Sequence, residues 1–572
     1  MAMHIHGSFS EQYGSMEGHL QQATLTGVNV LWWTDHDHRM EQWKFRNVVH
    51  FDSLAAEAGD GQPWTWQLRT TGSLASSSGG IQTTDVSPND TPGSGALSVS
   101  ARASTGTASY GYYADAHPAG WNYHGNIFGQ TLTIDVFMPT VNSGDSYLEV
   151  LIGSSWHPAR NGRPAGCYSL SYRFDTSGAP ASTNAQGVLG VVTRPVIPGA
   201  WNTVSLTPST DVATVWPDMQ ADDFASFALS LNAVSGGSAV CGVFDLLRFT
   251  RQYTSGDVPL QHQQTMMSAY AAPYPNVTQM QGLELSLLGT HLNWFGPGVT
   301  LPDFTGITGK NYNAFLVAQV NKIHAAGGVA SYNHPFGYGA LPPKSVSVQD
   351  SLVTSTASTL LGKNLLGCDI LEVGYPLRNG VDLTHHAALW DVLSANCRFT
   401  TANGVSDDHY GTDWAGQRNN WTTSVWAPSR SMIDLIDALR AGRAWTSSLS
   451  RFSGFLDLTA DGTCPMGSVS LSGATTRQVR VIATGIPVNG SVDVLRGAVD
   501  YLGARSARAA VVANISAADL IGGDSTLSID TRTECYVRTR IKDAYGLVVA
   551  LSNPVWLLRD APTTGIPIAR VA

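Results

Sequence analysis

The sequence carries little charge, and positive charge is the scarcer sign. Asp, Glu, Lys and Arg make up only 13% of the residues, with 33 basic against 43 acidic side chains. No dense run of Lys or Arg occurs, which argues against nucleic acid as a partner. Long apolar runs are also missing, because no stretch approaches the roughly 20 apolar residues that cross a bilayer. We therefore predict no transmembrane segment.

Cysteine is scarce too, with 6 in 572 residues. The cysteines fall two to each of three expected domains: Cys167 with Cys241, Cys368 with Cys397, and Cys464 with Cys535. Three disulfides and an oxidising compartment would fit this distribution, and buried free thiols are the alternative. We predict a secreted or cell-surface protein, with the cytoplasm left open. The first motif begins after three residues, so we expect the natural N-terminus to lie further upstream.

The length exceeds what one hydrophobic core supports, since single cores stop growing at about 250–300 residues. Hydrophobic residues at 43%, with 58 Gly and 27 Pro, indicate a folded chain with many turns. We predict three domains. The first is discontinuous, 1–49 with 257–450; the second, 50–256, is inserted into it; the third is 451–572.

Helix and strand patterns alternate in the discontinuous domain. Polar residues follow each strand, as in Thr34-Asp35-His36-Asp37 and Asn333-His334-Pro335. This alternation predicts a parallel sheet and an α/β barrel, with the active site at the carboxyl ends of the strands. The expected helices cover 16–26, capped by Gly27, and 315–323, 383–393 and 432–439; the expected strands cover 28–33, 329–332, 369–373 and 399–402.

Short β-like runs replace this pattern in the other two domains. A Ser/Thr/Gly-rich approach leads into runs such as 131–136, 147–152, 168–174, 227–231 and 243–249. Many short strands with turn residues between them predict a β-sandwich for the insertion. Runs at 479–482, 491–495 and 535–538 predict a smaller immunoglobulin-like sandwich at the C-terminal end.

Potential metal ligands occur in strand-like spacing at both ends of the first domain. Residues i and i+2 of a strand point to the same side, so His4 and His6 can chelate one ion. Asp407 and His409 can present a carboxylate and an imidazole to one pocket in the same way. Each pair alone is weak evidence, and its significance comes from the other motifs that lie between.

Taken in order, these motifs resemble the polymerase and histidinol phosphatase (PHP) family, whose metallohydrolases have a distorted seven-stranded barrel. The opening motif is 4–11, with Glu11 where the family usually has Asp. The resemblance covers residues 4–46 and about 257–450. The other motifs are 34–37, then 282–284 with His291, then 333–335, and finally 406–409.

The resemblance implies two or three divalent ions, with zinc, manganese or iron all suited to imidazole and carboxylate ligands. One ion would be held by His4, His6, Glu284 and Asp407, a second by Glu284, His291 and His334, and a third by Glu11, His36 and His409. His291 is the weakest of these ligands, since it could simply be packed. We predict that Asp35 orients a ligand imidazole, that Asp37, His38 or Asp408 handles protons, and that Arg378 is also catalytic; Arg39 and Arg378 are the basic residues nearest the motifs. Glu372 could be a ligand, but a role in supporting a ligand, or a structural role, is favoured.

The function predicted from this resemblance is hydrolysis of an ester-type bond by water activated between metal ions. The segments 439–445 and 552–556 look like the carbaryl-hydrolase-like branch with extra β-domains, which adds carbamate and carboxyl esters to phosphoesters as substrates. The substrate would be a small molecule or a glycan-linked ester. The insertion resembles carbohydrate-binding jelly rolls at 201–204 and 243–245. A glycan-binding surface protein that keeps the barrel as a scaffold is therefore the alternative.

Overall fold

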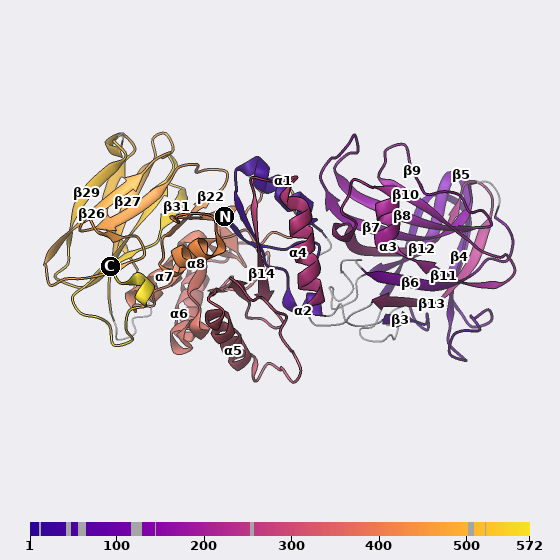
Figure 1. Ribbon diagram of the computed structural model, residues 1–572, viewed down its shortest axis with the longest axis horizontal. Helices are drawn as coiled ribbons and strands as arrows, with labels where there is room; N and C mark the ends of the chain where they lie inside the picture. The colour runs from indigo at the N-terminus through magenta and orange to yellow at the C-terminus, as the bar shows by residue number, and fades with distance from the viewer. Residues whose placement is uncertain are drawn as a thin grey trace.

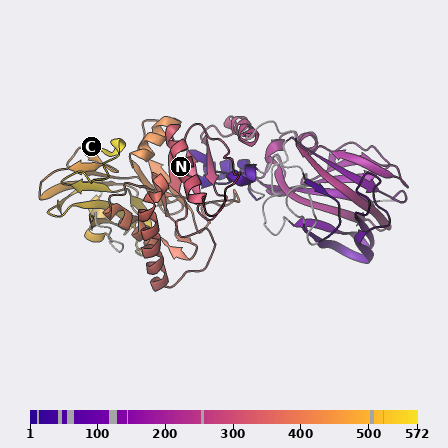
Figure 2. The same ribbon diagram turned by 90° about the horizontal axis from the view of Figure 1, so that it is seen from below.

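The structure is a computed structural model that describes residues 1–10, 13–41, 47–54, 65–115, 129–142, 145–251, 257–500, 508–520 and 522–572. The molecule is elongated, with three parts in a row (Figure 1). A part that contains both helices and strands lies in the middle, the C-terminal β-structure lies on one side of it, and the inserted β-structure on the other. The view from below shows the same order (Figure 2).

The middle part is organised by a seven-stranded sheet. Its strands, in spatial order, are β1 (Ala2–Ile5), β2 (Val30–Trp33), β14 (Thr278–Leu285), β15 (Leu292–Phe295), β16 (Val329–Tyr332), β17 (Ile370–Gly374) and β20 (Thr401–Gly404). The first strand also meets the chain just beyond the last one, since the His6 backbone N–H donates to the Asp408 carbonyl at 2.9 Å.

The prediction of a wholly parallel sheet is wrong at β15, which runs antiparallel to both β14 and β16. Only residues 286–291 connect β14 to β15. A connection between parallel strands needs a dozen or more residues, so a link this short permits only a hairpin. The sheet is therefore mixed, and Glu284 on β14 faces the residues that follow β16.

Helix α1 begins and ends at residues that cap it. The Ser15 side chain accepts a hydrogen bond from the Gly18 N–H, and Gly27 ends the helix at φ 73°. The predicted helices at 16–26, 315–323, 383–393 and 432–439 are present; α2, α4 and α6 were not anticipated. The helices are α1 (Met16–Thr26), α2 (Asp37–Glu41), α4 (Val258–Ala271), α5 (Tyr312–Ala325), α6 (Val346–Gly362), α7 (Leu383–Ala395) and α8 (Met432–Arg440).

The insertion is a β-sandwich built around one hydrophobic core. Its two longest strands, β4 and β5, form a hairpin in the Ser/Thr/Gly-rich stretch where no strand was expected. Strand β3 pairs with β13 of this sheet, although residues 47–49 were expected to belong to the first domain. The described strands are β3 (Asn47–Val49), β4 (Thr65–Gln82), β5 (Ala96–Asp115), β6 (Gln130–Phe137), β7 (Tyr147–His157), β8 (Gly166–Asp175), β9 (Ser182–Thr183), β10 (Leu189–Pro195), β11 (Trp201–Leu206), β12 (Ala225–Ser235) and β13 (Val240–Arg251), with α3 (Pro208–Val215) beside them.

The C-terminal part is a second sandwich, with its core between an eight-stranded and a four-stranded sheet. Strands β21 (Trp421–Val425) and β22 (Ala444–Ser448) belong to the larger sheet, although their residues were expected in the first domain. The remaining strands are β23 (Leu456–Ala460), β24 (Cys464–Pro465), β25 (Val469–Leu471), β26 (Thr476–Ala483), β27 (Ser491–Ala498), β28 (Ala510–Ser516), β29 (Asp524–Asp530), β30 (Cys535–Lys542), β31 (Val548–Ser552) and β32 (Val555–Leu558).

Buried polar contacts join the C-terminal sandwich to the middle part. The Arg538 guanidinium on β30 makes two hydrogen bonds, of 2.8 and 2.9 Å, to the Asp391 carboxylate on α7. The Asn553 side chain bonds both the N–H and the carbonyl of Ala402 on β20. The Trp556 indole donates to a carbonyl of α7 at 3.1 Å. These contacts fix the sandwich to the strand that precedes Asp407.

All six cysteines are free thiols, so the three disulfides that the sequence allowed are not formed. Cys167 lies on β8 and Cys241 on β13, and three strands separate β8 from β13 in the sheet. The disulfides that supported the prediction of an oxidising compartment are therefore not observed. Within the described residues, no helix is both long and apolar enough to cross a membrane.

Candidate metal centre

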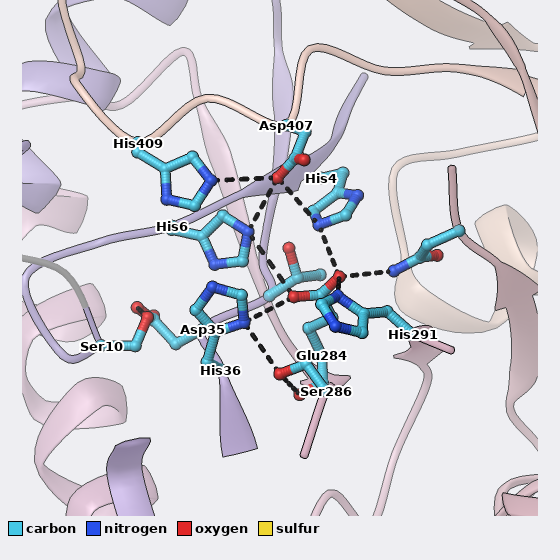
Figure 3. Close-up of polar contacts among 12 residues, drawn as sticks. His4, His6, Ser10, Asp35, His36, Glu284, Ser286, His291, Asp407 and His409 are labelled. Atoms are coloured by element: carbon cyan, nitrogen blue, oxygen red, sulfur yellow. Dashed lines mark hydrogen bonds and ion pairs between the residues drawn. The ribbon is translucent and has the colours of Figure 1, made fainter. Parts of the chain in front are cut away.

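Eight of the nine predicted ligands gather in one place, although they come from segments up to 405 residues apart. Figure 3 shows most of them pointing toward one another. The ninth, Glu11, lies outside the described residues. The eight are His4, His6, His36, Glu284, His291, His334, Asp407 and His409.

Among the described residues, three sets of three side chains have ligand atoms that lie within 4.8 Å of one another. One set is His4, His6 and Glu284, and a second is Glu284, His291 and His334, which equals the predicted second ion site. The third set is His6, His36 and His409. His36 and His409 were predicted to share an ion with Glu11, so His6 is an addition to that site.

Glu284 is the centre of the cluster. Its carboxylate lies 2.6 Å from Nδ1 of His36 and 3.2 Å from both Nε2 of His4 and Nδ1 of His291. The Asn333 amide donates to the same carboxylate at 2.9 Å. Glu284 thus belongs to two of the three sets and lies beside His36 of the third.

Asp407 occupies the opposite side of the cluster (Figure 3). Its Oδ1 lies 3.1 Å from Nε2 of His6 and 3.3 Å from the Nε2 atoms of His4 and His409. Its Oδ2 is bound by the guanidinium of Arg378. The backbone of Asp407 has φ 53°, an unfavourable conformation for a non-glycine residue that is typical of functional sites.

The pKa values of several side chains in the cluster lie far from their usual ranges. Burial alone would raise the pKa of Asp407, but Arg378 and His4 hold it well below its usual range. Burial lowers the pKa of His6, and the neighbouring His36 and His409 lower it further. Burial also disfavours the charged form of His4, yet Asp407, Glu372 and Glu284 raise its pKa. The carboxylates around His4 therefore favour a positive charge at this buried position, whether a proton or a metal cation carries it.

Two ring nitrogens in the cluster are buried without a hydrogen-bond partner among the described residues, Nε2 of His4 and Nδ1 of His6. Buried polar atoms are normally satisfied, so unsatisfied ones need an explanation. Imidazole nitrogens and carboxylate oxygens are the ligands of zinc, manganese and iron. The residues present therefore fit divalent metal ions.

Glu372 fixes the orientation of two candidate ligands from behind. Its Oε1 lies 2.7 Å from Nδ1 of His4, which leaves Nε2 of His4 directed at the cluster. Its Oε2 accepts hydrogen bonds from the His334 backbone N–H and the Tyr375 hydroxyl, both at 2.6 Å. The favoured sequence interpretation, a role behind the ligands, agrees with these contacts.

Replacing Glu372 by Gln is expected to weaken metal binding by about 10–100-fold, the usual effect of losing a partner that orients a ligand. The amide can accept from His4 or from the His334 and Tyr375 donors, but not from both sides. Titration with Zn²⁺ against a competing chelator measures the change. Tyr375→Phe is the control, because it leaves the contact between Glu372 and His4 intact. Equal affinities in all three proteins would show that Glu372 does not orient His4.

Asp35 and Asp408 make contacts that differ from the roles expected for them. The Asp35 carboxylate binds the turn after His6, accepting from the Gly7 N–H at 3.0 Å and the Ser10 hydroxyl at 2.7 Å. Asp408 accepts hydrogen bonds from the Gly411 N–H and from the side chains of Trp414 and Gln417. Both carboxylates are buried and engaged in holding loops, so we do not assign them to orienting an imidazole or to proton transfer.

Asp37 is also buried, and it accepts hydrogen bonds from nearby backbone N–H groups. Its Oδ1 accepts from the backbone N–H groups of His38 and Ser286, at 2.7 and 3.0 Å. The Ser286 hydroxyl in turn lies 2.8 Å from Nδ1 of His36. Ser286 was missed in the sequence, although its i+2 spacing from Glu284 places both on one side of a strand. Asp37 and Ser286 together support His36.

A cavity of about 510 Å³ opens over the cluster. Its lining combines cations with apolar and aromatic side chains. Tyr338, which is 58% exposed, stacks on His291 with ring centroids 5.2 Å apart. Beside the ligands, the cavity is lined by His38, Arg39, Ser286, Leu287, Leu288, Gly289, Tyr338 and Arg378.

No protein-family model matches the chain, and no curated protein matches it either. Several solved structures are similar to part of it. The family 11 carbohydrate-binding module of a cellulosomal cellulase of Clostridium thermocellum is 12% identical and covers 36% of this chain and 94% of its own, with a TM-score of 0.20. The family 30 module of another cellulase of that organism is 11% identical, with coverages of 36% and 94% and a TM-score of 0.19. SGBP-B, from a xyloglucan utilization locus in Bacteroides uniformis, is 11% identical, with coverages of 36% and 49% and a TM-score of 0.18. Similarity at this level leaves the function of the chain open.

Proposed function

We propose that this chain is a metal-dependent hydrolase of the PHP type that cleaves an ester bond, either a phosphoester or a carboxyl or carbamate ester. The proposal rests on the convergence of eight buried or half-buried imidazole and carboxylate ligands around Glu284. The seven-stranded sheet, with its first strand bonded to the chain beyond its last, would be the distorted barrel of that family.

The three sets of ligands would hold two or three divalent ions, with Zn²⁺, Mn²⁺ and Fe²⁺ as candidates. When bound, such ions lower the pKa of water toward neutrality and offset the charge that develops on the ester oxygen. Arg378 keeps the Asp407 carboxylate oriented, and together with Arg39 it gives the cavity positive charge. An anionic or strongly polarised ester group would bind there, with its apolar part against Leu287, Leu288 and Tyr338.

His38 is the residue we assign to proton movement in this cavity. It lines the cavity, whereas Asp37 and Asp408 do not. Burial lowers the pKa of His38 to about 4, so the ring is neutral at pH 7. A neutral imidazole has one donor and one acceptor nitrogen, so it can pass a proton between the substrate and solvent without holding it.

Elemental analysis of the purified protein, combined with hydrolysis of a panel of chromogenic esters, tests the proposal. The panel contains a phosphomonoester, a phosphodiester, a carboxyl ester and a carbamate. We expect two or three bound ions and turnover of one ester class. A protein that holds no metal and cannot be reconstituted with Zn²⁺, Mn²⁺ or Fe²⁺ would contradict the proposal.

We infer a second function for the insertion, the binding of a glycan. The exposed hairpin of β4 and β5 carries paired hydroxyls, with Thr71 and Ser109 oxygens 2.7 Å apart and Ser78 and Ser100 oxygens 2.8 Å apart. Hydroxyl-rich surfaces beside aromatic rings offer hydrogen bonds and stacking to sugars. The tryptophans of the insertion give less support, because Trp66 and Trp216 are core residues.

Affinity electrophoresis in polysaccharide gels, run with the Asp407→Ala variant, separates the two functions. Lost ester turnover with intact glycan binding supports an enzyme that carries a binding module. A parent protein that binds glycan but turns over no ester would instead support the alternative, a glycan-binding protein with the barrel as scaffold.

A further inference from the structure

A buried carboxylate of the insertion, that of Asp223, contacts the metal-bearing part. Within the described residues, the four hydrogen bonds to this carboxylate all come from outside the insertion. Its Oδ1 accepts from the Ser8 hydroxyl and the Met16 N–H, both at 2.7 Å, and its Oδ2 from the Glu17 N–H at 3.0 Å and the Tyr270 hydroxyl at 2.7 Å. Asp223 is fully buried, at the end of the short helix η2 (Ala221–Asp223).

Such a contact specifies one docking geometry. A buried carboxylate is costly unless hydrogen bonds replace its water, and here four donors do so. Two of these donors are the first backbone N–H groups of α1, where the helix dipole favours negative charge. Any displacement of the insertion would leave both the carboxylate and these amides unsatisfied.

A second contact lies beside the first. The Trp156 backbone at the end of β7 donates to the Tyr13 carbonyl at 2.7 Å and accepts from the Ser15 N–H at 3.2 Å. Within the insertion, the Ser155 N–H donates to the Phe224 carbonyl at 3.3 Å, which ties β7 to the segment that carries Asp223. The turn at 13–15 is thus bonded to the insertion as an added strand segment.

The turn at 13–15 also packs closely against the loop that follows His409. A Cβ on Gly14 would lie 2.6 Å from the Tyr410 carbonyl carbon. A Cβ on Gly18 would lie 3.0 Å from the Gly411 oxygen and 3.2 Å from the Trp156 ring. Because a Cβ would collide with the backbone at Gly14 and would be crowded at Gly18, the insertion, residues 13–18 and the loop at 409–411 are in tight contact.

We propose that the insertion positions the metal centre, and that the ion held by His6, His36 and His409 depends on it. Asp223 accepts a hydrogen bond from Ser8, which lies two residues after His6. Trp156 is hydrogen-bonded to the turn at 13–15, which packs against the residues that follow His409. Ligands on loops bind a metal only as well as the surrounding residues hold them in place. This inference rests on the proposed function.

Asp223→Asn tests the inference, because it keeps the shape of the side chain but turns one acceptor into a donor that faces other donors. We expect the affinity for the ion held by His6, His36 and His409 to fall about 10-fold, as for loss of other groups that support ligands. Equilibrium dialysis with Zn²⁺ and elemental analysis give the stoichiometry and the affinity. The unfolding temperature with and without chelator is measured on the same samples.

Asp211→Asn is the matched control. Asp211 accepts from the Tyr172 hydroxyl at 2.8 Å, the Arg194 guanidinium at 2.7 Å and the Thr207 N–H at 3.3 Å, all within the insertion. This variant should lower the unfolding temperature but leave ion binding as in the parent. Ser8→Ala, which removes one donor only, should weaken the same ion by a smaller factor and serves if Asp223→Asn does not fold.

The outcomes separate the inference from the proposed function. If the parent binds two or three ions and both Asp223→Asn and Ser8→Ala bind them equally well, the inference is overturned and the proposed function stands. If the parent binds no ion, both are overturned. Loss of one ion in Asp223→Asn but not in Asp211→Asn supports the inference.

Discussion

Replacing Glu284 by Gln is expected to abolish ion binding and ester hydrolysis together. Glu284 belongs to two of the three ligand sets and lies 2.6 Å from His36 of the third. Its negative charge is also what offsets several closely spaced imidazoles, since His291, His4 and His36 hold its pKa below the usual range against the effect of burial. The loss should exceed the 10–100-fold that removal of an outer partner costs.

Elemental analysis and turnover of the active ester measure this effect. Glu149→Gln is a suitable control, because Glu149 is also buried and accepts from Ser171 at 2.6 Å and Asn232 at 2.9 Å, but within the insertion. It should keep the ions of the parent. Full ion occupancy and normal turnover in Glu284→Gln would show that Glu284 does not hold the ions.

Replacing Arg538 by Met is expected to destabilise the contact between the C-terminal sandwich and α7 by about 3–5 kcal/mol, the typical effect of leaving a buried charge unpaired. The side chains of Arg538 and Asp391 are 3% and 5% exposed, so water cannot take the place of the lost partner. Chemical denaturation followed by intrinsic fluorescence measures the change, since Trp390 lies beneath the guanidinium.

Two further variants identify the cause. The double change Arg538→Met with Asp391→Leu should recover most of the lost stability, because a buried ion pair exchanged for apolar groups of similar size is often neutral or better. Arg532→Met removes the exposed partner of Asp530 and should change stability little. Equal destabilisation by Arg532→Met and Arg538→Met would contradict an effect of burial.

The sequence alone determined the elements whose pattern is local. Helix α1 has the predicted bounds because Ser15 and Gly27 supply its caps, and β16 has them because a glycine pair precedes a short apolar run. Strand spacing alone predicted only two pairs of candidate ligands, His4 with His6 and Asp407 with His409, and the rest of the set followed from the resemblance to the PHP family. Short-range periodicity expresses which face of an element is buried, so it can be read without knowing what covers that face.

Only the tertiary structure decided what distant segments do to one another. The hairpin of β14 and β15 made the sheet mixed, and the contact of His4 with Glu372 joins residues 368 positions apart. The contacts of Asp35 and Asp408 depend on hydrogen-bond donors that only the fold brings to them. No local sequence pattern indicated the hydrogen bond between Asp223 and Ser8. A carboxylate looks the same in sequence whether it meets a metal, a backbone amide or another domain, because its role depends on the partners that folding brings to it.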